Sequence, residues 1–183
     1  MGKRIGLIAD NHSRADDGSD LPDGVLRAFE GADVILHLGD AGSWGTFDRL
    51  ATVAPVMAVL GGHNGAEPDT RVRGLSRTET IDGLRVGMVH DLVARGVTSE
   101  SAPKMKFKAA PRESLRALFG GDIDLLAYAG THVPRIAWAD GMLFVNPGSP
   151  TMPLDRPKGS LGRVALIEIE DGVATARVVD LAG

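Results

Sequence analysis

The chain has 183 residues, 43% of them apolar and 24% charged, which is most simply one globular domain spanning residues 1–183. It has no cysteine, which excludes disulfides, thiolate metal sites and cysteine nucleophiles and makes the cytoplasm the default location. A formal net charge of −4 and 4% aromatic residues offer no strong field or stacking surface for nucleic acid, and no apolar run approaches the roughly 18 residues that span a bilayer.

The first half of the chain alternates apolar runs with helical segments. Strands are expected at residues 3–9, 33–39 and 55–61, where short apolar runs end in polar or glycine-containing turns. Helices are expected at residues 21–30 and 43–54. This βαβαβ order predicts a parallel sheet.

From about residue 76 the pattern changes to paired strands. Hairpin turns are expected at the Asp-Gly pairs of residues 82–83, 140–141 and 171–172. A helix is expected at residues 111–121, where a glycine pair could end it, and residues 93–110 have no clear period and favour a long loop. A parallel first half and an antiparallel second half predict an α/β fold, a four-layer α-β-β-α sandwich of two mixed sheets flanked by helices.

Aspartate and histidine recur where the predicted strands end. Asp10 and His12 follow the first strand, Asp40 follows the second after a glycine, and His90 and His132 end two later segments. Loops at strand ends can carry chemistry on a rigid sheet, so this repetition indicates a metal site. Residues two apart in an extended turn point the same way, so Asp10 and His12 can converge on one ion. Asp40 could bridge two cations, as two-metal hydrolases require at separations of ~3.5–4 Å.

Several of these residues also have a structural interpretation. A single Asp-x-His pair after a strand is common by chance. His37 faces an apolar environment, so we expect a hydrogen-bonded core histidine, or a support for a ligand, rather than a ligand. His63 could be a turn histidine in solvent. The joint pattern is more specific than any member, because the candidates all stand at predicted strand ends.

Six short motifs occur in the order in which a known family carries them. They are Asp10-x-His12, Gly39-Asp40, Gly61-x-His63, Val89-His90, Gly130-Thr131-His132 and Asn146-Pro147-Gly148-Ser149-Pro150. Together they resemble the calcineurin-like metallophosphoesterase signature over nearly the whole chain. The branch that looks most similar is that of the small bacterial and archaeal phosphodiesterases, which also includes the eukaryotic retromer scaffold subunit.

The resemblance implies two metal positions. The residues implied for the first ion are Asp10, His12, Asp40 and His132, and all four are present. The second ion would share Asp40 and bind His90. Its two further ligands in the family, an asparagine and a histidine, are replaced by Gly62 and Gly130. The first position therefore looks complete, while the second is depleted.

Neighbouring oxygen atoms could rebuild the second position. Asn64 follows a flexible glycine turn and Asp91 is adjacent to His90. His63 matches the family histidine that would protonate the leaving oxygen or stabilise the transition state. His63 and Asp40 are therefore the implied catalytic residues, with Asn64 added to the implied metal ligands.

The resemblance implies a metal-dependent phosphoric ester hydrolase, in which a metal-activated water attacks a phosphodiester in line. With oxygen and nitrogen ligands and no thiolate, Mn²⁺ is the first candidate and Fe, Zn and Mg are alternatives, for one or two ions. Because two ligands are glycine, the alternative is a catalytically weak or inactive scaffold or binding protein of the same fold.

A local basic run offers a third interpretation, a nucleic-acid-binding module. Lys104, Lys106, Lys108 and Arg112 lie close together, but only Phe107 interleaves with them. A solvated or lid-like face is favoured over a phosphate clamp, and a dedicated nucleic-acid surface is disfavoured. The expected partner is a small phosphorylated substrate, a phosphodiester, rather than a membrane or a nucleic acid, and a homo-oligomer stays open.

Overall fold

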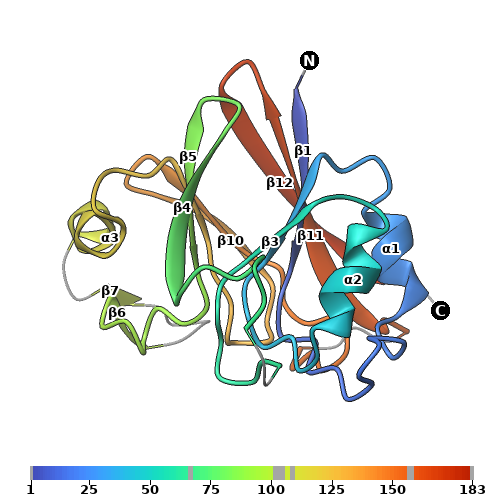
Figure 1. Ribbon diagram of the computed structural model, residues 1–183. Coiled ribbons are helices and arrows are strands. Elements are labelled where there is room, and N and C mark those ends of the chain that lie inside the picture. The colour runs from blue at the N-terminus through green and yellow to red at the C-terminus, as the bar shows by residue number, and fades with distance from the viewer. Residues whose placement is uncertain (1, 66–67, 101–105, 108–109, 156–158, 182–183) are drawn as a thin grey trace.

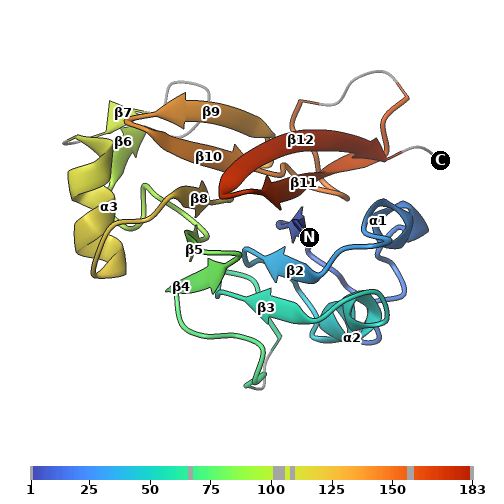
Figure 2. The ribbon, with the colours of Figure 1, turned by 90° about the horizontal axis from the view of Figure 1, so that it is seen from above.

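The computed structural model describes residues 2–65, 68–100, 106–107, 110–155 and 159–181. Within this part of the chain, two five-stranded sheets pack face to face, and a small two-stranded sheet lies beside them (Figure 2). Two helices cover one five-stranded sheet and a third helix covers the other, as Figure 1 shows. This arrangement confirms the predicted four-layer sandwich of two mixed sheets.

The first sheet has the strand order β12-β11-β1-β2-β3. Its members are β1 (Lys3–Ile8), β2 (Val34–His37), β3 (Val56–Ala58), β11 (Gly162–Glu170) and β12 (Val173–Leu181). The strands β1, β2 and β3 are parallel, as the βαβαβ pattern predicts. The connections between them are helices α1 (Asp23–Ala28) and α2 (Gly45–Ala51).

The second sheet has the order β4-β5-β8-β10-β9. Its members are β4 (Ser76–Ile81), β5 (Leu84–Val89), β8 (Leu125–Ala127), β9 (Arg135–Ala139) and β10 (Met142–Asn146). Its centre is parallel, since β8 pairs in parallel with both β5 and β10. The expectation of an antiparallel second half is therefore wrong in part. The crossover through helix α3 (Pro111–Phe119) brings β8 back parallel to β5, and the β11–β12 hairpin joins the first sheet, beside β1.

Successive side chains of a strand point to opposite faces of its sheet. Each sheet therefore contributes apolar side chains to two layers, one between the sheets and one beneath the helices. In β1, Ile5 and Leu7 face the core between the sheets, while Ile8 belongs to the cluster beneath α1 and α2. Gly6 lies on the helix side, where an added Cβ would stand 2.8 Å from the ring of Phe29. A side chain at this position would push the helix layer off the sheet.

The second sheet repeats this division. Val86 and Met88 of β5 enter the core between the sheets, whereas Val89 packs in the cluster beneath α3. Gly87 lies against Phe119, whose ring is 2.9 Å from the position of an added Cβ. One cluster therefore contains strands of both sheets, which fixes the sheets and the loops at their ends relative to one another.

The predicted turns are confirmed, while the predicted long loop is not a single loop. Each of the three Asp-Gly hairpin turns has positive φ at both residues, the pattern of a type I′ turn. Gly120 ends α3 in a left-handed conformation, with φ of 66°. Residues 93–110 contain a short ribbon, β6 (Thr98–Glu100) paired with β7 (Lys106–Phe107). No helix in the part of the chain that the structure describes is long and apolar enough to cross a membrane.

Candidate metal centre

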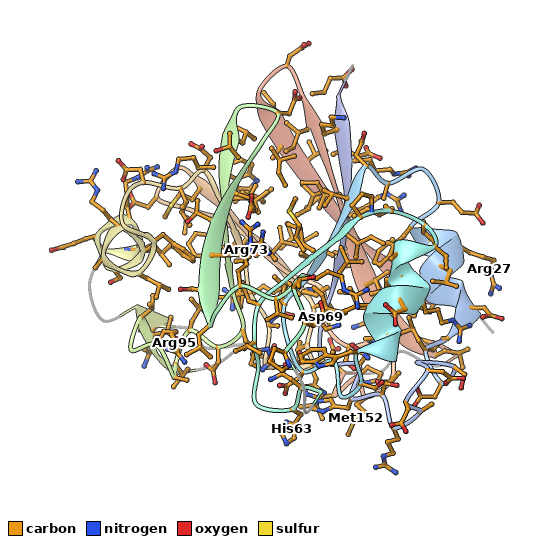
Figure 3. The ribbon with its side chains drawn as sticks, in the orientation of Figure 1. Arg27, His63, Asp69, Arg73, Arg95 and Met152 are labelled. Carbon is orange, nitrogen blue, oxygen red and sulfur yellow. The ribbon has the colours of Figure 1, made fainter. Side chains whose placement is uncertain are left out.

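The predicted ligands converge at one edge of the sandwich. They come from the loops after the parallel strands β1, β2 and β3 of the first sheet and β5 and β8 of the second, whose carboxyl ends meet there. This edge is the lower one in Figure 3, where His63 and Met152 are labelled. The residues that the structure brings together are Asp10, His12, Asp40, His63, His90 and His132.

The backbone at this edge is unusual. Among the described residues, seven other than glycine have positive φ, and three of these belong to the Asp-Gly hairpin turns. The other four are Asp10 (55°), His12 (43°), Asp40 (56°) and His132 (56°). Left-handed conformations of L-residues cost energy and gather at functional sites. Here every such residue outside a hairpin turn is a predicted metal ligand.

Backbone hydrogen bonds hold the first two loops together. Asp10 donates its N–H to the carbonyl of Gly39 at 3.1 Å, and His12 donates to that of Asp40 at 2.9 Å. Gly39, with φ of 99°, lies so close to the third strand that an added Cβ would be 2.6 Å from the amide nitrogen of Gly61. The lack of a side chain at Gly39 therefore permits this close backbone approach.

Asp10, His12 and His132 form the first group. The Asp10 side chain is fully buried, and its Oδ2 accepts the N–H of Gly130 at 3.1 Å. Its Oδ1 lies 3.8 Å from His132 Nε2, and the rings of His12 and His132 stack with centroids 5.2 Å apart. Asp10 Oδ1 and His12 Nε2 are both buried without a hydrogen-bond partner among the described residues. Such atoms need a partner, and a cation between them would supply it.

Asp40 lies between this group and the remaining histidines. Its Oδ2 is 3.6 Å from His12 Nε2, 3.5 Å from His90 Nε2 and 3.2 Å from His63 Nδ1. Its Oδ1 accepts the backbone N–H of His63 at 2.8 Å. His90 Nε2 is also 3.8 Å from Asp10 Oδ1, so His90 faces both carboxylates. One carboxylate therefore touches both halves of the cluster, as a bridging ligand would.

Two backbone carbonyls fix the orientation of His90 and His132. Nδ1 of His90 lies 2.8 Å from the carbonyl oxygen of Leu38, and Nδ1 of His132 lies 2.8 Å from that of Met152. Because a carbonyl only accepts, each Nδ1 carries a proton. Each Nε2 faces the carboxylates, where it could give its lone pair to a bound ion, which is the usual arrangement of a metal-binding histidine.

The electrostatics of the cluster depend on burial and on the contacts among its members. Burial raises the pKa of the Asp10 carboxyl, and the neighbouring His90 and His132 counter this only in part. Burial also acts to raise the pKa of Asp40, but hydrogen bonds from His90 and from the amide of His63 outweigh it and hold that pKa well below its usual range. Burial lowers the pKa of His12. Burial acts to lower the pKa of His90, but the contacts with Asp40 and Asp10 outweigh it and raise that pKa. A cation that displaced the proton of His90 would meet two carboxylates and neutral imidazoles, a donor set of charge −2, which fits a divalent cation.

The residues proposed to rebuild the second position are engaged elsewhere. The side-chain amide of Asn64 donates to the Gly61 carbonyl at 2.8 Å and accepts the Gly61 N–H at 3.2 Å. Asp91 Oδ1 accepts the N–H groups of Val93 and Ala94 at 2.7 and 3.1 Å. To bind an ion, Asn64 Oδ1 and Asp91 Oδ1 would have to share or give up these hydrogen bonds.

His37 is a core histidine, as its apolar setting predicts. It is fully buried, its Nδ1 accepts the Gly39 N–H at 3.1 Å, and its Nε2 lies 2.6 Å from Asn11 Oδ1. Burial lowers its pKa to about 3, so the ring is neutral. Asn11 also donates to the Ala41 carbonyl at 2.8 Å. The hydrogen bonds of His37 and Asn11 therefore hold in place the loops that carry Asp10 and Asp40.

Sequence reasoning missed the part that the Asn-Pro-Gly-Ser-Pro segment plays at the site. Its expected role as a structural turn is correct, since Asn146 Oδ1 accepts the Gly148 N–H at 2.9 Å. In addition, Ser149 is fully buried and donates its hydroxyl to the backbone carbonyl of Asp10 at 2.7 Å. The only signal in the sequence was the motif itself, because this contact joins residues 139 positions apart.

The structure describes two residues of the basic run, Lys106 and Arg112. Arg112 donates its backbone N–H and a guanidinium N–H to Asp140, in the β9–β10 turn. Lys106 lies in β7. Lys104 and Lys108, two of the four residues of the expected solvated or lid-like face, lie outside the described residues.

The fold and the cluster define a two-sheet α/β protein with a carboxylate–histidine site for a divalent metal at its loop edge. The model of the calcineurin-like phosphoesterase superfamily domain matches residues 4–172, and the chain belongs to this superfamily. A Methanothermobacter thermautotrophicus protein named "Probable metallophosphoesterase" is 35% identical over 156 residues, which cover 81% of this chain and 78% of the relative. Family membership supports a hydrolase that uses a divalent metal.

Solved structures show the same fold. Vacuolar Protein Sorting 29 of Cryptosporidium parvum superimposes with a TM-score of 0.69 at 19% identity, covering 100% of both chains. A novel archaeal phosphodiesterase superimposes with a TM-score of 0.64 at 18% identity, covering 96% of this chain and 99% of the other. At these identities the likeness concerns the fold alone.

Proposed function

We propose that this protein hydrolyses phosphodiesters with the help of a bound divalent metal. His63 serves the leaving group, and His90 contributes to a partial second metal position that shares Asp40. The residues that would hold the first ion are Asp10, His12, Asp40 and His132.

The observation that carries this proposal is the pair of buried, unpartnered atoms at the centre of the cluster. Asp10 Oδ1 and His12 Nε2 have no hydrogen-bond donor or acceptor among the described residues. Leaving a buried polar group unsatisfied costs ~1–3 kcal/mol, and more when the group is charged. The Nε2 atoms of His90 and His132 each lie 3.8 Å from Asp10 Oδ1. A cation would bind all four groups together, whereas a hydrophobic filling would leave them unsatisfied.

Hydrolysis of a diester requires one bond to form and one to break. The oxygen of a water bonds to phosphorus, the bond from phosphorus to the leaving alcohol breaks, and the leaving oxygen takes a proton while the attacking water loses one to solvent. A bound divalent ion would lower the pKa of water and neutralise phosphoryl charge. His63 is placed to give the proton, because its side chain is 73% exposed and its amide is anchored on Asp40.

We expect the depleted second metal position to lower both the rate of hydrolysis and the number of bound ions. Gly62 and Gly130 provide no side-chain ligand, and Asn64 and Asp91 are bonded within their own turns. We therefore propose weak activity that depends mainly on the first ion. Manganese as the metal and the cytoplasm as the location stay predictions from composition.

The experiment is hydrolysis of bis(p-nitrophenyl) phosphate by metal-stripped protein with and without Mn²⁺. We expect turnover only with the metal, and none in Asp40→Asn. Asp171→Asn is the matched control, since it makes the same change at another residue of positive φ, in the β11–β12 turn. Turnover that persists in Asp40→Asn would contradict the assignment of the site.

A catalytically weak or inactive scaffold is the second candidate. The glycines at 62 and 130 favour it, and the fold likeness to Vacuolar Protein Sorting 29 is compatible with it. A scaffold predicts no turnover of diester or monoester with several metals, although Mn²⁺ could still bind and raise the melting temperature. Metal-dependent turnover that Asp40→Asn abolishes would rule this candidate out.

A further inference from the structure

A cavity of about 320 Å³ opens beside Asp40, between the loops that follow β3 and β5. His63 and His90 lie in its wall next to the carboxylate. Gly62 widens it, because an added Cβ there would have Asp40 Oδ1, at 3.9 Å, as its only neighbour within 4 Å. The volume is that of a small-molecule subsite.

The far part of the cavity has an apolar wall and one cationic side chain. Leu60 and Leu75 provide apolar surface, and Arg95 is the only arginine or lysine among the described residues of the lining. Within the described part of the chain, no carboxylate lies in ion-pair distance of Arg95, and its side chain is exposed. Asp91, which also lines the cavity, accepts two N–H groups of its own turn through Oδ1. The Arg95 guanidinium is therefore available to an anionic ligand.

The position of His63 indicates which half of a substrate would enter this cavity. A side chain that protonates the leaving oxygen must stand on the leaving-group side of phosphorus. His63 is part of the cavity wall, and Arg95 stands apart from it toward β6 and β7 in Figure 3. An alcohol that departs beside His63 would extend along Leu60 and Leu75 toward Arg95.

We propose that this cavity binds the leaving alcohol of the phosphodiester and that Arg95 selects alcohols that carry a second anionic group. The chemical class is an alcohol or phenol with an apolar body and an oxyanion, a carboxylate or a phosphate, at its far end. This inference rests on the proposed function for the direction of the leaving group. Arg95 is a specificity residue in it, and the bond-breaking step remains the one described above.

The test compares two diesters with the same chromophore, phenyl 4-nitrophenyl phosphate and phenyl 3-carboxy-4-nitrophenyl phosphate, in the presence of Mn²⁺. The measured quantity is the ratio of kcat/KM for the carboxylated diester to kcat/KM for the neutral one. We expect a ratio of roughly ten in the wild type, the effect of one charge-assisted hydrogen bond. Arg95→Gln should bring the ratio to about one, and Arg95→Lys should retain part of it.

Arg27→Gln is the matched control, because it removes one positive charge from an exposed arginine of α1, on the opposite side of the molecule in Figure 3. It should leave the ratio as in the wild type. A wild-type ratio near one, or equal losses in Arg95→Gln and Arg27→Gln, would overturn the proposal.

A binding measurement separates failure of the subsite from failure of the proposed function. The released phenols, 5-hydroxy-2-nitrobenzoate and 4-nitrophenol, are titrated into the Mn²⁺-loaded protein by calorimetry. If neither diester is hydrolysed, the proposed function fails, and the titration alone decides the subsite. Roughly tenfold tighter binding of the carboxylate, lost in Arg95→Gln, would support the subsite, and equal binding of the two phenols would overturn it.

Discussion

Gly62→Asn should add a ligand at the second metal position without straining the backbone. The φ of Gly62 lies outside the left-handed range, and its added Cβ would meet Asp40 Oδ1 at an ordinary contact distance of 3.9 Å. An asparagine oxygen would then stand next to the carboxylate that the second ion would share. We expect roughly tenfold tighter binding of a second Mn²⁺, equivalent to ~1.4 kcal/mol, together with faster diester hydrolysis.

Gly130→His should behave differently, although it also adds a ligand. Gly130 has φ of +80°, and its N–H donates to Asp10 Oδ2. An added Cβ would stand 3.5 Å from His90 Nε2, so space is adequate and the backbone conformation is the obstacle. A left-handed non-glycine residue costs ~1–2 kcal/mol, and we expect the free energy of unfolding to fall by that amount.

The assays are Mn²⁺ titration by calorimetry, bis(p-nitrophenyl) phosphate hydrolysis and urea denaturation of the metal-free protein. Gly62→Leu is the control for Gly62→Asn, because leucine has nearly the same shape and no ligand atom. Gly130→Ala isolates the backbone cost from the imidazole. A gain in Gly62→Leu equal to that in Gly62→Asn, or an unchanged stability in Gly130→Ala, would refute this reasoning.

Three further predictions concern the metal, the buried histidine and the turn beneath the site. Mn²⁺ at a hundredfold excess over its dissociation constant should stabilise the protein by ~2.7 kcal/mol, seen as a higher melting temperature, and Asp10→Ala should abolish the shift. The folded pKa of His37, about 3, lies below its unfolded value of 6.5, so only the unfolded chain takes up this proton as the pH falls from 6.5 toward 3. This group should therefore cost up to ~1.4 kcal/mol per pH unit in that window, and the stability advantage of wild type over His37→Gln in urea should shrink between pH 7 and pH 5. Ser149→Ala should cost ~1–2 kcal/mol in urea and weaken Mn²⁺ binding, since it removes the hydroxyl bonded to the Asp10 carbonyl, whereas an unchanged affinity would show that Asp10 is held without it.

Local patterns predicted the elements of the fold, while the pairing of distant segments needed the structure. The three Asp-Gly pairs predicted three hairpin turns, because type I′ turns require such residues. Those turns say nothing about which sheet a hairpin joins, so the place of β11 and β12 beside β1 was not predictable. The short β6–β7 ribbon, with one strand of two residues, has too little period to be recognised.

The candidate site also combines features that the sequence predicts with features that only the structure shows. Asp10, His12 and Asp40 were found because strand ends carry them into loops, a pattern that is visible along the chain. Their left-handed backbone, and the contact of Ser149 with Asp10, arise from packing between segments far apart in sequence. The same holds for Arg95, which no motif marks and which enters the cavity wall only through the fold.

The interior of the site bears on the choice between an enzyme and a scaffold. Asp10 is fully buried and has one oxygen without a hydrogen-bond partner among the described residues, while His12, Asp40 and His132 hold left-handed conformations that cost energy. A docked protein partner would contact the exposed rim, where His63 stands, and would leave the Asp10 oxygen as it is. An ion small enough to lie among the carboxylates and imidazoles reaches this oxygen directly. We therefore expect a cation, and not a surface partner, to offset the stability cost at this edge, whichever activity the rim supports.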